Sequence, residues 1–401
     1  MRGRRDHIRR GCGEVRACLG KFQVQSQELK VARIASRLRV TGGGFELGFG
    51  TIVGQDLAKR VLTRAVREEP AHAYLFLGLE GTGKLTTALE FGKALNCENP
   101  RDGNACAQCA ICHAIEHGNL PDMRVWSPER QDTTIKSMRE MRDLAAFKPM
   151  RGKWVINIIE QGDTLNEDSA SCILKLLEEP PDYVINILLY RNAANVLPTI
   201  RSRCQLVRFE QVDAAVLSAA LVEDFGVGPR EAEFLATYSQ GRPGIAIGLI
   251  GDEEFQRRRE SISSVAGAAS EGKPWAALAL AEALRTNVAA SDDEDDEEEA
   301  SAQPSGKAAT AARSGARQAT SESLDMLLIW YRDLMATKLQ GENAAVVNSD
   351  MREQLLEQSA RYRHAGPLLA GIEAILQAKR RVQGNGIPQI VTEALMVRLA
   401  V

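Results

Sequence analysis

The chain has 401 residues, a length typical of two or three domains. Its 50 Lys and Arg against 53 Asp and Glu give a net charge of −3, which argues against a protein whose whole surface coats nucleic acid. Apolar residues make up 44% of the chain, enough for a sizeable core, and no run of about 18 apolar residues predicts a membrane span. Eight cysteines are too few for a disulfide scaffold.

Charge is concentrated in two segments that the sequence predicts to be disordered. Residues 1–40 carry eleven Lys and Arg against three acids, and Asp292–Glu299 is a run of eight consecutive acids. Neither segment shows an apolar period. We therefore expect a basic disordered extension over residues 1–48 and a disordered acidic insert over residues 288–320. The extension lacks the apolar core of a secretory signal, and an unstructured segment is a simpler interpretation than a transit peptide.

Between these segments, predicted strands alternate with predicted helices. Apolar runs predict strands at Ala73–Leu77, Trp154–Ile159, Val184–Tyr190 and Leu206–Phe209. Helical periods follow Asp56 and cover Lys84–Asn96, Ile135–Phe147 and Ala170–Glu179. This alternation predicts a parallel sheet with helices on both faces.

After Glu210 the sequence predicts only helices. Two or three short ones are expected over residues 211–250, where Gly241-Arg-Pro-Gly244 interrupts the pattern. Longer helical periods cover residues 251–287, Leu324–Leu339, Met351–Val382 and Ile387–Leu399.

A glycine-rich loop joins the first strand to a helix, which is the context of a phosphate-binding loop. Its candidate binding residues are Gly78, Gly81, Gly83, Lys84 and Thr86. Leu85 stands where the hydroxyl that binds Mg²⁺ is expected, and Thr86 lies about 100° further around the helix. The pattern predicts a nucleotide-binding fold, leaves retained ATP binding doubtful and disfavours hydrolysis.

The end of the next strand shows a second defect of the same kind. An ATPase needs an Asp there to hold Mg²⁺ and a Glu to polarise water. This chain has Glu160, whose side chain is one methylene longer, followed by the uncharged Gln161. Two independent defects argue against a working ATPase.

Four cysteines with close spacing predict a metal site. They follow the pattern Cys97-x8-Cys106-x2-Cys109-x2-Cys112, and four thiolates suit a structural Zn²⁺. An iron–sulfur site and disulfides are the alternatives, and His113 and His117 are expected to be bystanders because four sulfurs complete the shell.

An arginine-rich turn, Leu197–Cys204, follows the third predicted strand. One interpretation is a basic surface turn. Another is an arginine presented to the ATP of a neighbouring subunit, since a guanidinium is always charged and binds phosphate in a bidentate manner.

Taken in order, five motifs resemble the bacterial DNA polymerase III clamp-loader subunits of the AAA+ superfamily. They are His72-Ala-Tyr-Leu-Phe-x-Gly78, the altered phosphate loop, Ala94-Leu-Asn-Cys97 with its cysteines, Leu174-Lys-x-Leu-Glu-Glu-Pro-Pro181 and Thr199-Ile-Arg-Ser-Arg-Cys204. The resemblance is strong over residues 49–250 and weak over 251–401. It implies an α/β AAA+ base (49–210) with a zinc module (97–112), a helical lid (211–250) and an all-α collar (251–401).

Within this family the altered motifs are similar to the non-catalytic subunit type. The resemblance implies that Arg203, flanked by Ser202 and Cys204, acts in trans on a neighbour's ATP. It implies partnership with tau/gamma and delta subunits, contact with sliding clamp and primed DNA through the complex, and a cytoplasmic location. A catalytic tau/gamma-type motor and a zinc-dependent DNA-binding protein are the alternatives, so enzymatic activity of the chain itself stays open.

Overall fold

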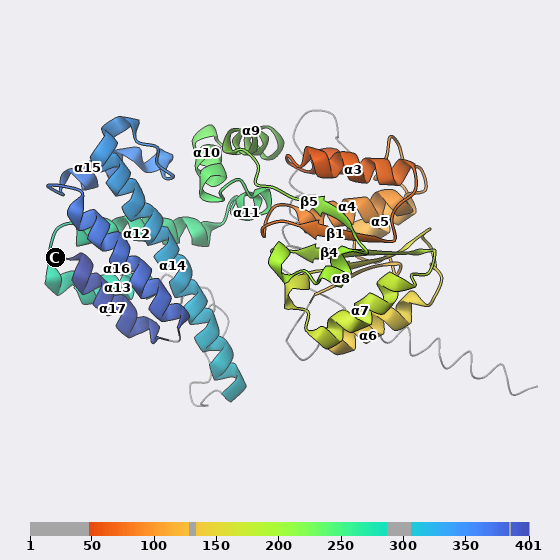
Figure 1. The fold of residues 1–401 in the computed structure, drawn as a ribbon. Coiled ribbons are helices and arrows are strands. Elements are labelled where there is room, and N and C mark those ends of the chain that lie inside the picture. Colours follow the sequence, from red (N-terminus) through yellow and green to blue (C-terminus); the bar gives the residue numbers. More distant parts are fainter. Residues whose placement is uncertain (1–47, 128–133, 287–305, 385, 401) are drawn as a thin grey trace, which may run out of the picture. The chain divides into compact units, whose positions relative to one another are not determined.

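The computed structural model describes residues 48–127, 134–286, 306–384 and 386–400, which form two compact units (Figure 1). One unit ends at Gly248 and the other begins at Leu249. The predicted basic extension lies outside the described residues apart from Gly48, which begins a short 3-10 helix. Among the described residues, no helix is both long and apolar enough to cross a bilayer.

The first unit contains a five-stranded parallel sheet with the strand order β2-β3-β4-β1-β5. The strands are β1 (Ala73–Leu77), β2 (Met123–Trp126), β3 (Val155–Ile159), β4 (Val184–Tyr190) and β5 (Gln205–Arg208). Every residue of β3 and β4 is buried, as expected for central strands covered on both faces. The predicted α/β fold with a parallel sheet is therefore confirmed.

Helices pack on both faces of this sheet, as Figure 1 shows. Side chains of α3 and α4 share one buried cluster with the strands, and side chains of α6 and α7 share the other. The helices up to β5 are α3 (Asp56–Arg67), α4 (Lys84–Asn96), α5 (Ala110–Glu116), α6 (Thr134–Ala145), α7 (Glu167–Glu178) and α8 (Pro198–Arg201). Three short helices complete the unit: α9 (Ala214–Phe225), α10 (Pro229–Tyr238) and α11 (Pro243–Gly248).

The second unit is helical throughout its described residues, as predicted for the C-terminal region. Its helices are α12 (Glu253–Ala269), α13 (Ala277–Thr286), α14 (Gly306–Gln340), α15 (Arg352–Ala360), α16 (Gly366–Gln383) and α17 (Pro388–Leu399). The chain divides into two units only, so the boundaries of the predicted base, lid and collar stay predictions.

Two expectations for this region need correction. Residues 288–305 of the predicted disordered insert lie outside the described residues. Residues 306–320, its remaining part, form the first turns of α14. Ala, Lys, Arg and Gln in that segment favour a helix more than its low complexity suggests. The single helix expected over Met351–Val382 is two helices, because Pro367 is accommodated only in the first turn of α16.

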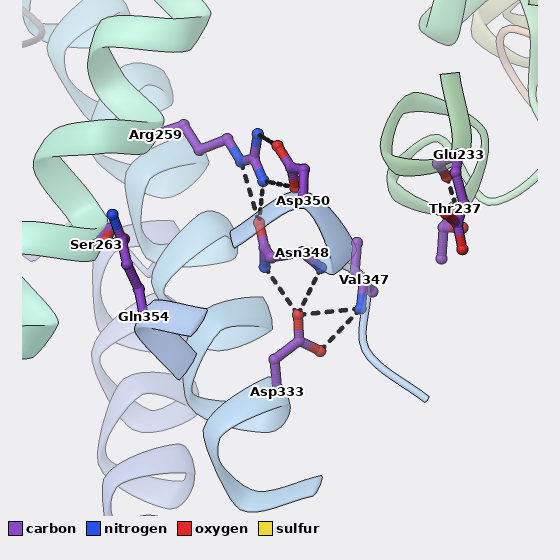
Figure 2. Close-up of polar contacts among 9 residues, drawn as sticks. All are labelled: Glu233, Thr237, Arg259, Ser263, Asp333, Val347, Asn348, Asp350 and Gln354. Carbon is purple, nitrogen blue, oxygen red and sulfur yellow. Dashed lines mark hydrogen bonds and ion pairs between the residues drawn. The ribbon is translucent and has the colours of Figure 1, made fainter. Parts of the chain in front are cut away.

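A buried polar network holds the loop before α15 against α12 and α14 (Figure 2). Arg259 donates to the Asn348 side-chain oxygen and to both carboxylate oxygens of Asp350. Asp333, which is fully buried, accepts from the backbone N–H groups of Val347 and Asn348 and from the Asn348 amide. Each charge has several partners, which is the condition under which buried charges are tolerated.

Candidate functional site

The candidate phosphate loop connects the carboxyl end of β1 to the first residue of α4. A Cβ on Gly78 would lie 2.4 Å from the carbonyl oxygen of Phe209, so the chain beyond β5 packs directly against the start of the loop. Gly81 and Gly83 have φ angles of +80° and +91°, which side chains rarely adopt. The sequence therefore keeps the shape of a phosphate loop.

Lys84 is turned onto the loop itself. Its Nζ donates to the carbonyl oxygens of Gly78 and Leu79, at 2.6 Å each, and the residue is only 6% exposed. In a nucleotide-holding loop the same ammonium reaches the β- and γ-phosphates. Here the two carbonyl oxygens stabilise the ammonium by accepting its hydrogen bonds.

The residues after Lys84 lack the geometry for a bound magnesium ion. Leu85 is 2% exposed and belongs to the buried cluster that also contains Phe91 and Phe209. Thr86 is half-buried, and its neighbour Thr87 uses its hydroxyl to donate to the Gly83 carbonyl oxygen. A core side chain thus occupies the place of the expected hydroxyl.

Helix α11 covers the loop from outside. The Gly244 N–H donates to the Gly81 carbonyl oxygen at 2.7 Å. A Cβ on Gly81 would lie 2.6 Å from Cγ1 of Ile245, so the two segments are in close contact. From the sequence, residues 241–244 were predicted only to interrupt the helical pattern, and nothing in it indicated this contact.

The acidic residues that follow β3 accept hydrogen bonds from other groups of the chain. Glu160 is 4% exposed and accepts a hydrogen bond from the Ser127 hydroxyl. Gln161 has a left-handed φ of +50° and is exposed. The next acid, Asp163, accepts from the backbone N–H groups of Arg191 and Asn192 and so caps the loop after β4.

The four predicted cysteine ligands lie together: Cys97 follows α4, Cys106 and Cys109 precede α5, and Cys112 lies in its first turn. Their sulfur atoms are all within 4.8 Å of one another, and Cys112 Sγ lies 3.8 Å from Cys97 Sγ and 4.0 Å from Cys106 Sγ. Zn–S bonds of about 2.3 Å in a tetrahedron imply sulfur separations of about 3.8 Å. All four cysteines are unpaired thiols, which excludes disulfides among them, and the cluster can hold a metal ion.

Backbone groups and burial act on these thiols in opposite directions. The N–H of Gln108 lowers the pKa of Cys106 to about 6, because a hydrogen bond to sulfur favours the thiolate. Burial raises the pKa of Cys97 and of Cys112. Further N–H groups donate to Cys97 and Cys109, as is usual around metal-binding sulfur.

The arginine-rich segment Leu197–Cys204 contains α8 and the turn that leads to β5. Arg203 Nη2 is 2.9 Å from a carboxylate oxygen of Glu178, and Nη1 donates to the Thr199 carbonyl oxygen. Ser202 donates to the same carbonyl, and burial raises the pKa of Cys204 to about 12. The Arg203 side chain is still 36% exposed, so a ligand can reach its guanidinium.

The sheet separates Arg203 from the chain's own phosphate loop. β5 pairs with β1 in parallel, with Gln205 opposite Tyr74, so Arg203 precedes the amino end of β5. The phosphate loop begins at Gly78, after the carboxyl end of β1. Gly78 lies four residues beyond Tyr74, which is about 13 Å along the strand. Of the predicted site residues, the structure brings the loop glycines and Lys84 together and the four cysteines together, and it keeps Arg203 apart from both.

The chain is similar to known subunits of DNA polymerase III. Residues 54–213 match the family described as "DNA polymerase III, delta subunit". The chain is similar to DNA polymerase III subunit delta' of Bacillus subtilis (strain 168), with 26% identity over 83% of this chain and 92% of that protein. It is 31% identical to subunit delta' of Pseudomonas aeruginosa over 50% of this chain and 62% of the relative.

Similarity to larger relatives is confined to part of their length. Subunit tau of B. subtilis is 30% identical over 50% of this chain, but the chain spans only 37% of tau. The corresponding share of tau/gamma of Haemophilus influenzae is 25%. A solved DNA polymerase III gamma subunit-related protein of Thermotoga maritima is similar over 80% of this chain, with 15% identity and a TM-score of 0.41.

Proposed function

We propose that the chain is a clamp-loader subunit of DNA polymerase III and, within that group, the delta'-type member, which does not hydrolyse ATP itself. Its role is to help load the sliding clamp onto primed DNA as part of the loader. Arg203 completes the ATP site of a neighbouring subunit, where its guanidinium stabilises the charge of the transferring phosphoryl group.

The observation that carries this proposal is the separation of the two sites. Arg203 lies at the end of the sheet opposite to the chain's own phosphate loop, which supports a role on a nucleotide held by another chain. The loop itself contains Leu85 in the core and Lys84 bound to carbonyl groups. Both features suit a subunit that contributes to catalysis only across an interface.

The partners follow from the same proposal. Tau/gamma subunits supply the ATP that Arg203 reaches, delta completes the ring, and sliding clamp and primed DNA are engaged through the complex. The site of action is the cytoplasm. In the four-cysteine cluster we propose one structural Zn²⁺, because four sulfur ligands leave no open coordination position.

The experiment that tests the arginine role uses a reconstituted loader with tau/gamma, delta, clamp and primed DNA. Arg203→Ala abolishes turnover at the one site that it serves, because an arginine finger contributes roughly 10³–10⁵ in kcat there. DNA-stimulated ATP hydrolysis by the whole loader therefore falls, while gel filtration shows intact assembly. Arg201→Ala, on the exposed neighbouring arginine, is the matched control and leaves hydrolysis unchanged.

Unchanged hydrolysis in the Arg203→Ala loader refutes the arginine role. The alternative is a catalytic subunit of the tau/gamma type, which the similarity to tau supports. It is tested on the purified chain alone. ATP turnover by that chain, lost on Lys84→Ala, identifies a motor subunit instead.

A further inference from the structure

The carboxylate that contacts Arg203 comes from a different helix of the same unit. Glu178 is the last residue of α7, and its Oε1 lies 2.9 Å from Nη2 of Arg203. Arg203 itself follows α8, in the turn that leads to β5. The ion pair therefore joins the end of one helix to a turn that lies further along the chain.

The backbones that carry the two side chains are anchored in the core. Leu177, which precedes Glu178, is 2% exposed, and Ile200 of α8 is fully buried. Both belong to the buried cluster that α6 and α7 form with the sheet. The Arg203 N–H donates to the Ile200 carbonyl oxygen at 3.1 Å. The ion pair thus forms between two parts of the unit that are fixed to the same core.

The guanidinium of Arg203 makes three polar contacts with side chains and carbonyl groups of the described residues. Besides the Glu178 carboxylate, Nη1 donates to the Thr199 carbonyl oxygen at 3.1 Å and to the Ser202 hydroxyl oxygen at 3.4 Å. A guanidinium has five N–H donors, so these contacts orient the group and still leave donors for a phosphate. Of the three acceptors, Glu178 carries the full negative charge.

The position of Glu178 is unfavourable for the helix that carries it. The C-terminus of a helix has a partial negative charge, which disfavours carboxylates there, yet α7 ends with Glu178 and its C-cap is Glu179. The ion pair contributes little to stability, because the side chains of Glu178 and Arg203 are 50% and 36% exposed. Stability of the fold therefore gives little reason for the pair, whereas orientation of Arg203 gives one.

We propose that Glu178 is the positioning residue for Arg203. The proposal rests on the proposed role of Arg203 and deepens it. Glu178 does not touch the neighbour's nucleotide. It holds the guanidinium in one orientation, so that less rotamer freedom is lost when Arg203 reaches the phosphate. Because an arginine finger acts on the transition state, loss of its orientation lowers kcat and leaves the KM for ATP unchanged.

The test uses the loader reconstituted with tau/gamma, delta, clamp and primed DNA. The measured quantity is the part of its ATP hydrolysis that Arg203→Ala removes. Glu178→Gln keeps the length of the side chain and an acceptor oxygen but removes the charge, so it lowers the kcat of this part by about tenfold. Glu178→Ala removes the acceptor as well and lowers kcat further.

The adjacent carboxylate provides a matched control. Glu179 is exposed at the same helix end and forms no ion pair in the part of the chain that the structure describes. Glu179→Gln removes the same charge as Glu178→Gln and leaves hydrolysis unchanged.

A double substitution separates positioning from a structural role. In a loader with Arg203→Ala, the side chain that Glu178 orients is absent, so adding Glu178→Gln causes no further loss of hydrolysis. A structural effect of Glu178→Gln would persist in this background, and a further loss refutes the proposal. Gel filtration and melting temperatures check that each variant assembles and folds, and both stay close to wild type because the pair is exposed.

Failure of the arginine role and failure of the positioning role give different results. If Arg203→Ala leaves hydrolysis unchanged, both fail. If Arg203→Ala lowers hydrolysis while Glu178→Gln and Glu178→Ala match wild type, the positioning role alone is refuted. A rise in hydrolysis with Glu178→Gln also refutes it, because the carboxylate then restrains Arg203 from its target. Equal losses with Glu178→Gln and Glu179→Gln refute it as well, since they show a general effect of charge at this helix end.

Discussion

Leu85 fills a position in the core at which a catalytic phosphate loop carries a hydroxyl. The residue is 2% exposed and shares a buried cluster with Phe76, Phe91 and Phe209. Packing in the core requires an apolar side chain at this position, whereas magnesium binding requires a hydroxyl.

Restoring the hydroxyl with Leu85→Thr is expected to destabilise the protein without creating an ATPase. The free energy of unfolding falls by about 2–4 kcal/mol, because apolar volume is lost and a hydroxyl is buried. Turnover does not appear, since Glu160 and Gln161 are unchanged. Urea unfolding and an ATPase assay on the purified variant measure both effects.

Thr86→Ala is the control for this change. Thr86 is half-buried and outside the core cluster, so its loss is expected to alter stability by less than about 1 kcal/mol. ATP turnover by the Leu85→Thr variant contradicts the assignment of the loop as non-catalytic.

Among the structural elements, the loop of residues 344–351 depends on a carboxylate in α14. Asp333 accepts from two backbone N–H groups and one amide, and an asparagine in its place would direct an NH₂ group at some of these donors. We expect Asp333→Asn to lower the free energy of unfolding by about 2–3 kcal/mol. Thermal and urea unfolding measure the loss.

A matched aspartate on the same helix provides the control. Asp325 pairs with Lys379 near the surface, and its side chain is 42% exposed. Because exposed ion pairs contribute only about 0–1 kcal/mol, Asp325→Asn is expected to have a small effect. Equal effects of the two substitutions would show that the network does not stabilise the loop.

The segment that contains α5 is expected to depend on the zinc ion that we propose for the four cysteines. Only short elements lie between α4 and β2, and the buried cluster there consists largely of the four cysteines. We expect one zinc per chain by elemental analysis, and a lower melting temperature after Cys109→Ser or after chelation. Cys172→Ser, which alters a thiol outside the cluster, leaves both unchanged. Finding iron, or no metal, contradicts the zinc assignment.

For the whole molecule, the three central strands and the edge strand β5 were predictable from the sequence, and the other edge strand, β2, was not. Ala73–Leu77 and Val184–Tyr190 match the predicted ranges because continuous apolar runs identify buried strands. β2 was missed: it has four residues, contains Arg124 and is mostly half-buried, so no apolar period marks it. The cysteine cluster was predictable because its ligands are close in sequence.

Contacts between distant segments had no such pattern. The position of Arg203 opposite to the phosphate loop follows from the parallel pairing of β1 with β5, which connects residues far apart in the chain. The hydrogen bonds from residues 150–152 to Asp122 and the contact of Ile245 with Gly81 are of the same kind. Sequence spacing predicts local chemistry, whereas these contacts require the sheet order.

The contact between Gly244 and Gly81 restricts which residues can be substituted in related sequences. The bond joins backbone atoms, so exchanges at 85, 160 and 161 leave it intact. A side chain at 81 would collide with Ile245 on a backbone with φ of +80°, and one at 244 would crowd the Gly81 carbonyl oxygen at 3.0 Å. Residues 85, 160 and 161 can therefore change in related sequences while the two glycines are retained, and the loop then keeps its backbone shape.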